Sequence, residues 1–80
     1  MLEPMLFRVP PKAGDGSYSH VGEEFIYMLK GTLEIWLGEL ERHLLRPGDR
    51  FWFGSNVGHR WFNSSDEDAL LLWINTPLTF

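Results

Sequence analysis

Two short clusters of polar side chains, far apart in the sequence, hold the residue types of this chain that can do chemistry. The first is Tyr18-x-His20-x3-Glu24, and the second is His59-x3-Asn63. Imidazole nitrogens and a carboxylate are ligands that borderline divalent metals prefer, and two histidines with one carboxylate leave coordination positions open for a substrate. The two clusters therefore predict a pocket at which a metal could bind.

Strand geometry groups these side chains on common faces, because residues at even separations on a β-strand point to the same side. The face that carries His20 and Glu24 includes three more residues, Tyr18, Ile26 and Met28. In the later segment, His59 and Trp61 share a face, while Arg60 and Phe62 take the other. If the two faces meet inside a closed sheet, His20, Glu24 and His59 converge.

A histidine in an aromatic-rich strand is more often a hydrogen-bonded core residue than a ligand. Glu24 shifts this balance, because it precedes the apolar run Phe25-Ile26-Tyr27-Met28-Leu29. Burying its carboxylate without a positive partner is costly, and a metal ion or a neighbouring imidazolium would supply that partner.

Length and composition predict one small domain that needs extra stabilisation. A domain of 80 residues buries only about 60% of its unfolded surface. The chain has no cysteine for a disulfide, which fits a reducing cytoplasm, and small domains without disulfides usually rely on a metal or on oligomerisation. Four Trp and six Phe are more than one small interior holds easily, so some aromatic surface either meets a second copy or closes over a ligand, and we expect a homodimer.

The charge pattern argues against several other partners. The net charge is −4 and the seven Lys and Arg residues are scattered, so no basic stripe is available for direct nucleic-acid binding. No apolar stretch approaches the roughly 20 residues that cross a bilayer, and residues 1–11 lack the pattern of a secretion signal. These features predict a soluble, cytoplasmic protein without a membrane partner.

Strand and turn signals cover almost the whole chain and no helical pattern is convincing. The predicted strands span residues 5–9, 23–29, 32–37, 41–46, 50–53, 59–62 and 69–75. Residues 12–17 are predicted as a loop because of Gly14-Asp15-Gly16. Lys30-Gly31 predicts a hairpin between the second and third strands, and Pro47-Gly48-Asp49 predicts a turn.

Short strands at regular spacing with no helical period predict an all-β fold, either an antiparallel sandwich or a barrel. The last strand is apolar on both faces from Leu70 to Ile74. We therefore expect both of its faces to be covered, with a dimer partner as one candidate for the outer cover.

The residues also carry a family resemblance. The stretch from Gly14 to Phe80 resembles a cupin domain, a small antiparallel jelly-roll or double-stranded β-helix barrel, so that residues 1–80 would form a single cupin domain. The first cupin motif is matched by Tyr18, His20, Glu24 and Gly31, and the second by Gly48, His59 and Asn63. Tyr18 stands where the family usually has its first metal-ligating histidine, and Lys12, Gly54 and Asn56 depart from the glycine and proline positions.

The resemblance implies His20, Glu24 and His59 as metal ligands, with Tyr18 as a fourth ligand or a pocket wall. A phenol is a poorer ligand than imidazole at neutral pH, although it can bind iron as phenolate. The implied cofactor is a divalent transition metal, with iron, manganese, zinc and nickel all open. The other predicted ligand-binding residues are Met28, Phe53 and Trp61.

The sequence pattern of residues 20–31 and 73–77 resembles that of the sensor cupin of bacterial regulators that carry a helix-turn-helix domain. In that group the cupin binds a small molecule and dimerises, so this chain is either a free-standing relative or a piece of a longer regulator. We favour a small-molecule-binding module. The alternative is a metal-dependent enzyme, either a dioxygenase or an isomerase or epimerase that moves a proton with His or Tyr.

Two polar residues have simpler interpretations. His43, between charged neighbours, is expected to be a surface or dimer-edge residue, and Asn63 is expected to tie down the turn after its strand.

Overall fold

A computed structural model describes residues 3–18, 22–54 and 58–77, and every regular element in these ranges is a β-strand. The strands are β1 (Glu3–Val9), β2 (Gly14–Tyr18), β3 (Gly22–Lys30), β4 (Leu33–Leu37), β5 (Glu41–Leu45), β6 (Arg50–Gly54), β7 (His59–Phe62) and β8 (Ala69–Pro77). Within the described ranges there is no helix with the length and apolar character needed to span a membrane.

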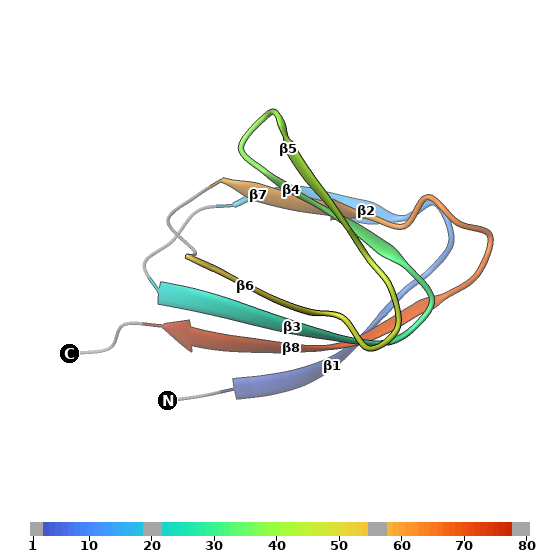
Figure 1. Ribbon diagram of the computed structural model, residues 1–80, viewed down its shortest axis with the longest axis horizontal. Helices are drawn as coiled ribbons and strands as arrows, with labels where there is room; N and C mark the ends of the chain where they lie inside the picture. Colours follow the sequence, from blue (N-terminus) through green and yellow to red (C-terminus); the bar gives the residue numbers. More distant parts are fainter. Residues whose placement is uncertain (1–2, 19–21, 55–57, 78–80) are drawn as a thin grey trace.

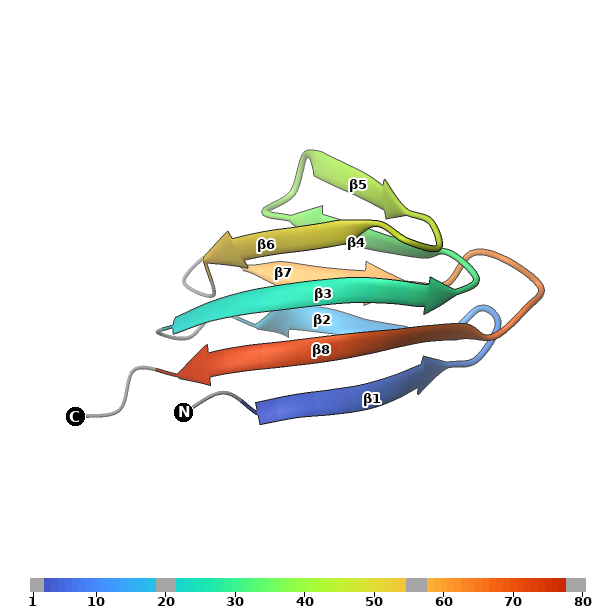
Figure 2. The same cartoon turned by 60° about the horizontal axis from the view of Figure 1, so that its bottom comes forward.

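The strands form two four-stranded sheets that face each other, as Figure 1 shows almost edge-on. Sheet A has the strand order β1-β8-β3-β6 and sheet B has the order β2-β7-β4-β5. All pairs are antiparallel, and Figure 2 shows sheet A in front of sheet B. The prediction of an all-β antiparallel fold is therefore confirmed.

The core lies between the two sheets, where alternate residues of each strand point inward. On β3 and β8 the inward residues are completely or almost completely buried. The core comprises Val9, Ile26, Met28, Leu33, Ile35, Leu45, Phe53, Ala69, Leu71 and Trp73. Buried apolar side chains from both sheets thus surround any polar group that reaches the interior.

The prediction of a loop over residues 12–17 is confirmed for residues 12 and 13 and is wrong from Gly14, where strand β2 begins. Its glycines are required by close packing and not by a turn. A Cβ atom on Gly16 would lie 1.9 Å from the Cβ of Arg60, and one on Gly14 would lie 2.4 Å from the carbonyl oxygen of Trp61. The glycines therefore let β2 pair with β7.

The predicted hairpin around Gly31 is also wrong, because β3 and β4 belong to different sheets. Gly31 has a φ of 74°, and a Cβ there would lie 2.4 Å from the carbonyl oxygen of Asp68. Glycine adopts a positive φ without steric cost and leaves room for the neighbouring backbone of Asp68. The chain passes through Gly31 from sheet A to sheet B and does not fold back to pair β3 with β4. This crossing carries the Glu24 strand away from direct pairing with β4.

The outer face of sheet A is apolar but only partly covered within one chain. On β8 the outward residues Leu70, Leu72 and Ile74 are half-buried. Their neighbours include Leu6, which is 63% exposed, and Trp52, which is 62% exposed. The expected second cover of β8 is therefore not supplied by the described part of the same chain.

Candidate functional site

The sandwich interior contains an acid and an imidazole in direct contact. Glu24 lies on β3 of sheet A and His59 lies on β7 of sheet B, so the two facing sheets bring them together from distant parts of the chain. The Nε2 atom of His59 is 2.9 Å from Oε2 of Glu24. Each residue is only 3% exposed. The predicted convergence is therefore observed for these two members of the candidate site.

The second carboxylate oxygen of Glu24 accepts a hydrogen bond from the indole Nε1 of Trp73, at 2.5 Å. Trp73 lies on the neighbouring strand β8, and Phe53 is the cross-strand partner of Glu24 on β6. The ring of Phe53 packs against the imidazole of His59, with 5.0 Å between their centroids. The carboxylate is thus held through one oxygen by an indole and through the other by an imidazole, which fixes its orientation.

Trp73 is a site residue that sequence reasoning missed. Its position was readable from strand alternation, because residues 69, 71 and 73 are all buried on the inner face of β8. What alternation cannot show is that the indole nitrogen meets Glu24. A buried Trp N–H usually finds an acceptor, and this was the available signal.

The Glu24 and His59 side chains fit a metal-binding role by their separation. Two neighbouring ligands that bind one ion at about 2.0–2.2 Å, roughly at right angles, have donor atoms about 3 Å apart. The observed 2.9 Å between Nε2 and Oε2 is close to this value, and the Trp73 hydrogen bond resembles the outer contacts that orient ligating carboxylates.

The structure describes two of the four predicted metal ligands with their side chains, Glu24 and His59. His20 lies outside the described residues, and only the backbone of Tyr18 is described, paired with His59 across β2 and β7. Among residues 3–18, 22–54 and 58–77 no three His, Cys, Asp or Glu side chains form a metal-binding group. The described site is therefore a two-residue pair.

The three predicted ligand-binding residues occupy different positions. Met28 is completely buried in the core, and Phe53 is buried beside His59. Trp61 is half-buried and packs edge-on against Trp73, with 5.1 Å between ring centroids. Phe53 thus contacts a member of the Glu24–His59 pair directly, whereas Trp61 contacts the indole that supports the pair.

His43 lies on strand β5 at the edge of sheet B, where its side chain is 36% exposed. Its Nε2 is 2.6 Å from a carboxylate oxygen of Glu41. The imidazole also contacts the ring of Phe51, with 4.6 Å between centroids. His43 is therefore a half-exposed edge residue that is separated from His59 by two phenylalanine rings.

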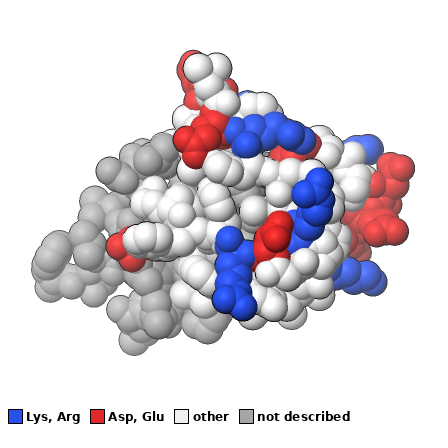
Figure 3. All heavy atoms as spheres, viewed as in Figure 1, with Lys and Arg blue, Asp and Glu red and all other residues white. Residues whose placement is uncertain are grey.

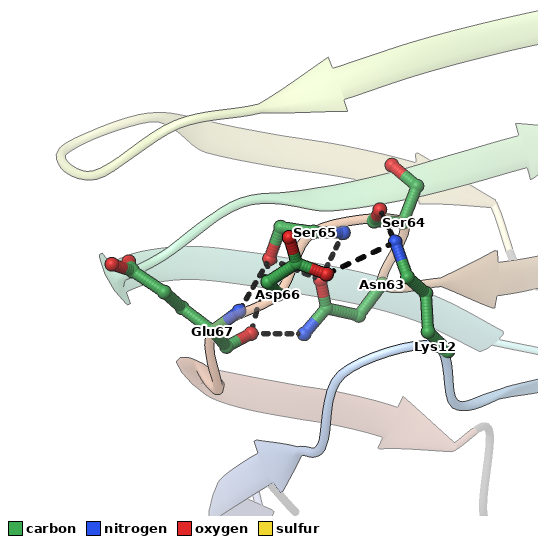
Figure 4. A network of polar contacts seen from close by, with 6 residues as sticks. All are labelled: Lys12, Asn63, Ser64, Ser65, Asp66 and Glu67. Carbon is green, nitrogen blue, oxygen red and sulfur yellow. Dashed lines mark hydrogen bonds and ion pairs between the residues drawn. The ribbon is translucent and has the colours of Figure 1, made fainter.

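Asn63 ties down the turn after β7, as expected. It is completely buried, and its Nδ2 donates hydrogen bonds to the carbonyl oxygens of Val9 and Glu67 at 3.0 and 2.6 Å. Its Oδ1 accepts hydrogen bonds from the backbone nitrogen and the hydroxyl of Ser65. Figure 4 shows this network, together with Lys12 reaching the same turn.

Replacing Asn63 with alanine is expected to lower the free energy of unfolding by about 2–3 kcal/mol, because buried carbonyl groups would lose their donors. Urea denaturation followed by tryptophan fluorescence measures this loss. A matched Ser64→Ala variant changes an exposed residue of the same turn and should remain within about 0.5 kcal/mol of the parent. Equal stability of the Asn63 variant and the parent would contradict the anchoring role.

Charged side chains on the outer face of sheet B are balanced locally. Arg42 donates a hydrogen bond to Glu34 at 3.0 Å, and this contact is the main reason that the pKa of Glu34 lies below its ordinary value. The guanidinium of Arg60 lies 4.8 Å from the ring centroid of Trp36. On the face shown in Figure 3, basic and acidic side chains lie next to each other.

Comparisons with known proteins agree with the two-sheet architecture. The family model described as "Cupin domain" matches residues 5–75. A search of curated proteins finds no match. The solved structure of TT1209 from Thermus thermophilus is 29% identical, covers 90% of this chain and 69% of its own, and has a TM-score of 0.81.

Two further solved structures show the same fold at lower identity. The Cupin_2 domain of an XRE family transcriptional regulator from Enterobacter cloacae is 20% identical, with coverage of 98% of this chain and 83% of its own and a TM-score of 0.86. HppE with iron(II) and substrate is 23% identical, with coverage of 94% and 45% and a TM-score of 0.81. This chain therefore spans less than half of HppE.

Proposed function

The chain belongs to the cupin domain family, and from this premise we propose that it is a small-molecule-binding module centred on Glu24 and His59. The observation that carries the proposal is the burial of this acid and imidazole, 2.9 Å apart, beside the apolar core between the two sheets. Burying ionisable groups is expensive, and apolar residues of similar size are often more stabilising. A polar pair at this position therefore points to a binding role.

A divalent transition metal fits the same pair. Glu24 and His59 would hold it, and His20 would complete the ligand set that the family resemblance implies. When bound, such a metal supplies open coordination positions for oxygen atoms of a ligand. The iron(II) of HppE belongs to that protein, and for this chain iron, manganese, zinc and nickel are all retained as candidates.

Metal analysis of the protein purified without a nickel column or chelator tests the proposal. We expect close to one transition metal ion per chain, or saturable binding of Mn²⁺, Fe²⁺, Zn²⁺ or Ni²⁺ by titration calorimetry. Glu24→Gln and His59→Gln should both lose this binding. The matched control is His43→Gln, which removes a histidine two rings away from the pair and should bind like the parent. Equal losses in all three variants would overturn the assignment.

The biological setting proposed for the module is that of a regulator's sensor. Similarity to the Cupin_2 domain of an XRE family regulator over 98% of this chain supports this setting at the level of fold. Contact with DNA would be made by another domain, and the cytoplasmic location stays a prediction. We do not favour the enzyme alternative. An acid and an imidazole in contact do not define a reaction, and similarity of fold to an enzyme does not imply its activity.

We also propose that the partner on the outer face of sheet A is a second copy of this chain. The middle of this face is apolar, with Leu6, Leu72 and Trp52 among its outward residues. Contiguous exposed apolar patches of this kind usually mark an interface. An antiparallel sheet with a solvated outer face normally carries polar residues there.

The charges at the two ends of this face complement each other in a symmetric dimer. Glu23 lies at one end, while Lys30 and Arg8 lie at the other, and all three are exposed. Arg8 is ion-paired there with Asp68, so Lys30 supplies the basic charge, while Arg50 lies on β6 in the row that contains Leu72 and Leu6. A two-fold axis that crosses the strands, in the plane between two stacked sheets, places the acidic end of one copy over the basic end of its partner. This self-complementarity favours a second copy over an unrelated protein.

Replacing Trp52 with glutamate is expected to convert a dimer into a monomer, because the exposed ring would lie within the interface. Light scattering after size exclusion measures the mass of each species. The matched control is Phe62→Glu, which places a charge on the partly exposed outer face of sheet B and should leave the dimer intact. A monomeric parent, or a Trp52→Glu variant that remains dimeric, would contradict this interface.

A further inference from the structure

A side cavity opens at the edge of the sandwich where β1 of sheet A lies beside β2 of sheet B. It has a volume of about 240 Å³. Side chains from both sheets line it, among them Phe7, Val9, Ala13, Asp15, Trp61 and Trp73. Neither Glu24 nor His59 lines the side cavity, so it is distinct from the polar pair.

Three aromatic rings form the apolar wall of this cavity. Trp73 contacts Phe7 edge-to-face, with 5.6 Å between ring centroids and an interplanar angle of 84°. It also contacts Trp61 at 5.1 Å and 66°. Trp73 is buried, whereas Phe7 is 36% exposed. The cavity thus runs from a partly exposed ring at its mouth to a buried indole at its base.

The volume limits what the cavity can accept. A dry engineered cavity of about 150 Å³ holds one benzene molecule. A cavity of about 240 Å³ therefore has room for one aromatic ring with a short chain of two or three atoms attached.

The charged groups at the cavity indicate the charge of the substituent that a bound ligand would carry. Asp15 lines the cavity and is exposed, and its Oδ1 accepts a hydrogen bond from the backbone of Gly16 at 2.8 Å. A carboxylate accepts several hydrogen bonds at once, so it can also receive those of an ammonium group. The Arg8 guanidinium also lines the cavity and is engaged with Asp68 at 3.0 Å. Asp15 is therefore the carboxylate at this opening that a cationic group of a ligand can approach.

We propose that this side cavity binds an aryl-alkylammonium group, with the aromatic ring against Trp61 and Trp73 and the ammonium near Asp15. Aromatic walls favour both the ring and a nearby cation. Because the Trp73 indole also donates to Glu24, the cavity and the polar pair share one side chain. The inference goes beyond the proposed function and requires no metal.

Nuclear magnetic resonance of the indole N–H signals tests this proposal with three probes: phenethylammonium, phenylacetate and phenylethanol. We expect saturable shifts of the Trp61 and Trp73 signals with phenethylammonium, at a Kd of about 1 mM for so small a ligand. Phenylethanol should bind about three- to fivefold more weakly and phenylacetate more weakly still. Equal responses to all three probes, or no saturation, would overturn the proposal.

Two variants locate the binding. Ala13→Leu fills the cavity and should abolish the shifts, whereas Trp36→Phe, on the outer face of sheet B, should leave them unchanged. Asp15→Asn should remove the preference for phenethylammonium over phenylethanol. Glu24→Gln should still bind phenethylammonium, so loss of the metal site and loss of the side cavity give different results. Unchanged binding in Ala13→Leu would place the ligand elsewhere and overturn the proposal.

Discussion

Replacing Glu24 with alanine is expected to lower the free energy of unfolding by about 3–5 kcal/mol, because two buried groups lose their shared partner at about 1–3 kcal/mol each. The substitution leaves the Trp73 indole without its acceptor and the His59 imidazole without its carboxylate. A small domain has roughly 5–15 kcal/mol in total, so the variant should approach the limit of folding. Urea denaturation followed by tryptophan fluorescence gives the value.

Glu24→Gln serves as the matched variant for this experiment. Its amide keeps an acceptor for Trp73 and a donor for a neutral imidazole, so we expect a loss of only about 1–2 kcal/mol. A loss below about 1 kcal/mol for Glu24→Ala would contradict the buried contact.

The double variant Glu24→Leu/His59→Leu separates a binding role from a structural one. If the function of the pair is binding, two apolar residues in its place should retain or raise stability, as happens when buried ion pairs are replaced by apolar residues of similar volume. Metal or ligand binding should be lost at the same time. A double variant as unstable as the sum of the two single variants would show that the pair is needed for folding.

The sequence predicted the part of the site that depends on strand alternation. Glu24 and His59 were expected to face each other because each lies on the inner face of its strand, and the family resemblance assigned them to one site. Both are buried and in contact. Alternation depends only on the strand itself, so it predicts the face of each residue correctly even where the predicted neighbours of the strand are wrong.

The errors came from glycines and from pairing between distant segments. Gly14 and Gly16 carry the ordinary signal of a turn, but they are needed because Arg60 and Trp61 of β7 approach them closely. Gly31 carries the signal of a hairpin, yet the chain crosses between sheets there. In both cases the reason lies on a strand remote in sequence, which local turn chemistry does not reveal.

The contact of Trp73 with Glu24 has the same origin. The two residues lie on neighbouring strands, where Glu24 is directly opposite Asn75 and Trp73 is directly opposite Ile26. The side chains of Glu24 and Trp73 therefore meet diagonally. Diagonal neighbours across a sheet lie within reach of aromatic side chains. Register must therefore be known before this second support of the carboxylate can be recognised.

Replacing Tyr18 with histidine is expected to tighten binding of a divalent metal by about tenfold or more, which corresponds to about 1.4 kcal/mol. Tyr18 is the cross-strand partner of His59, after a register shift that follows Gly16, and the family resemblance assigns a metal-ligating histidine to this position. A histidine at position 18 should therefore join the pair as a further ligand. Titration calorimetry with Mn²⁺ or Zn²⁺ measures the gain.

Tyr18→Phe completes this test, because it removes the phenol without adding an imidazole. If the phenol ligates the metal, Tyr18→Phe should weaken binding while Tyr18→His strengthens it. If Tyr18 is a pocket wall, Tyr18→Phe should bind like the parent, and only the histidine variant should differ. No gain in Tyr18→His would mean that position 18 does not adjoin a metal. The site would then be one for an organic ligand held by Glu24 and His59 alone.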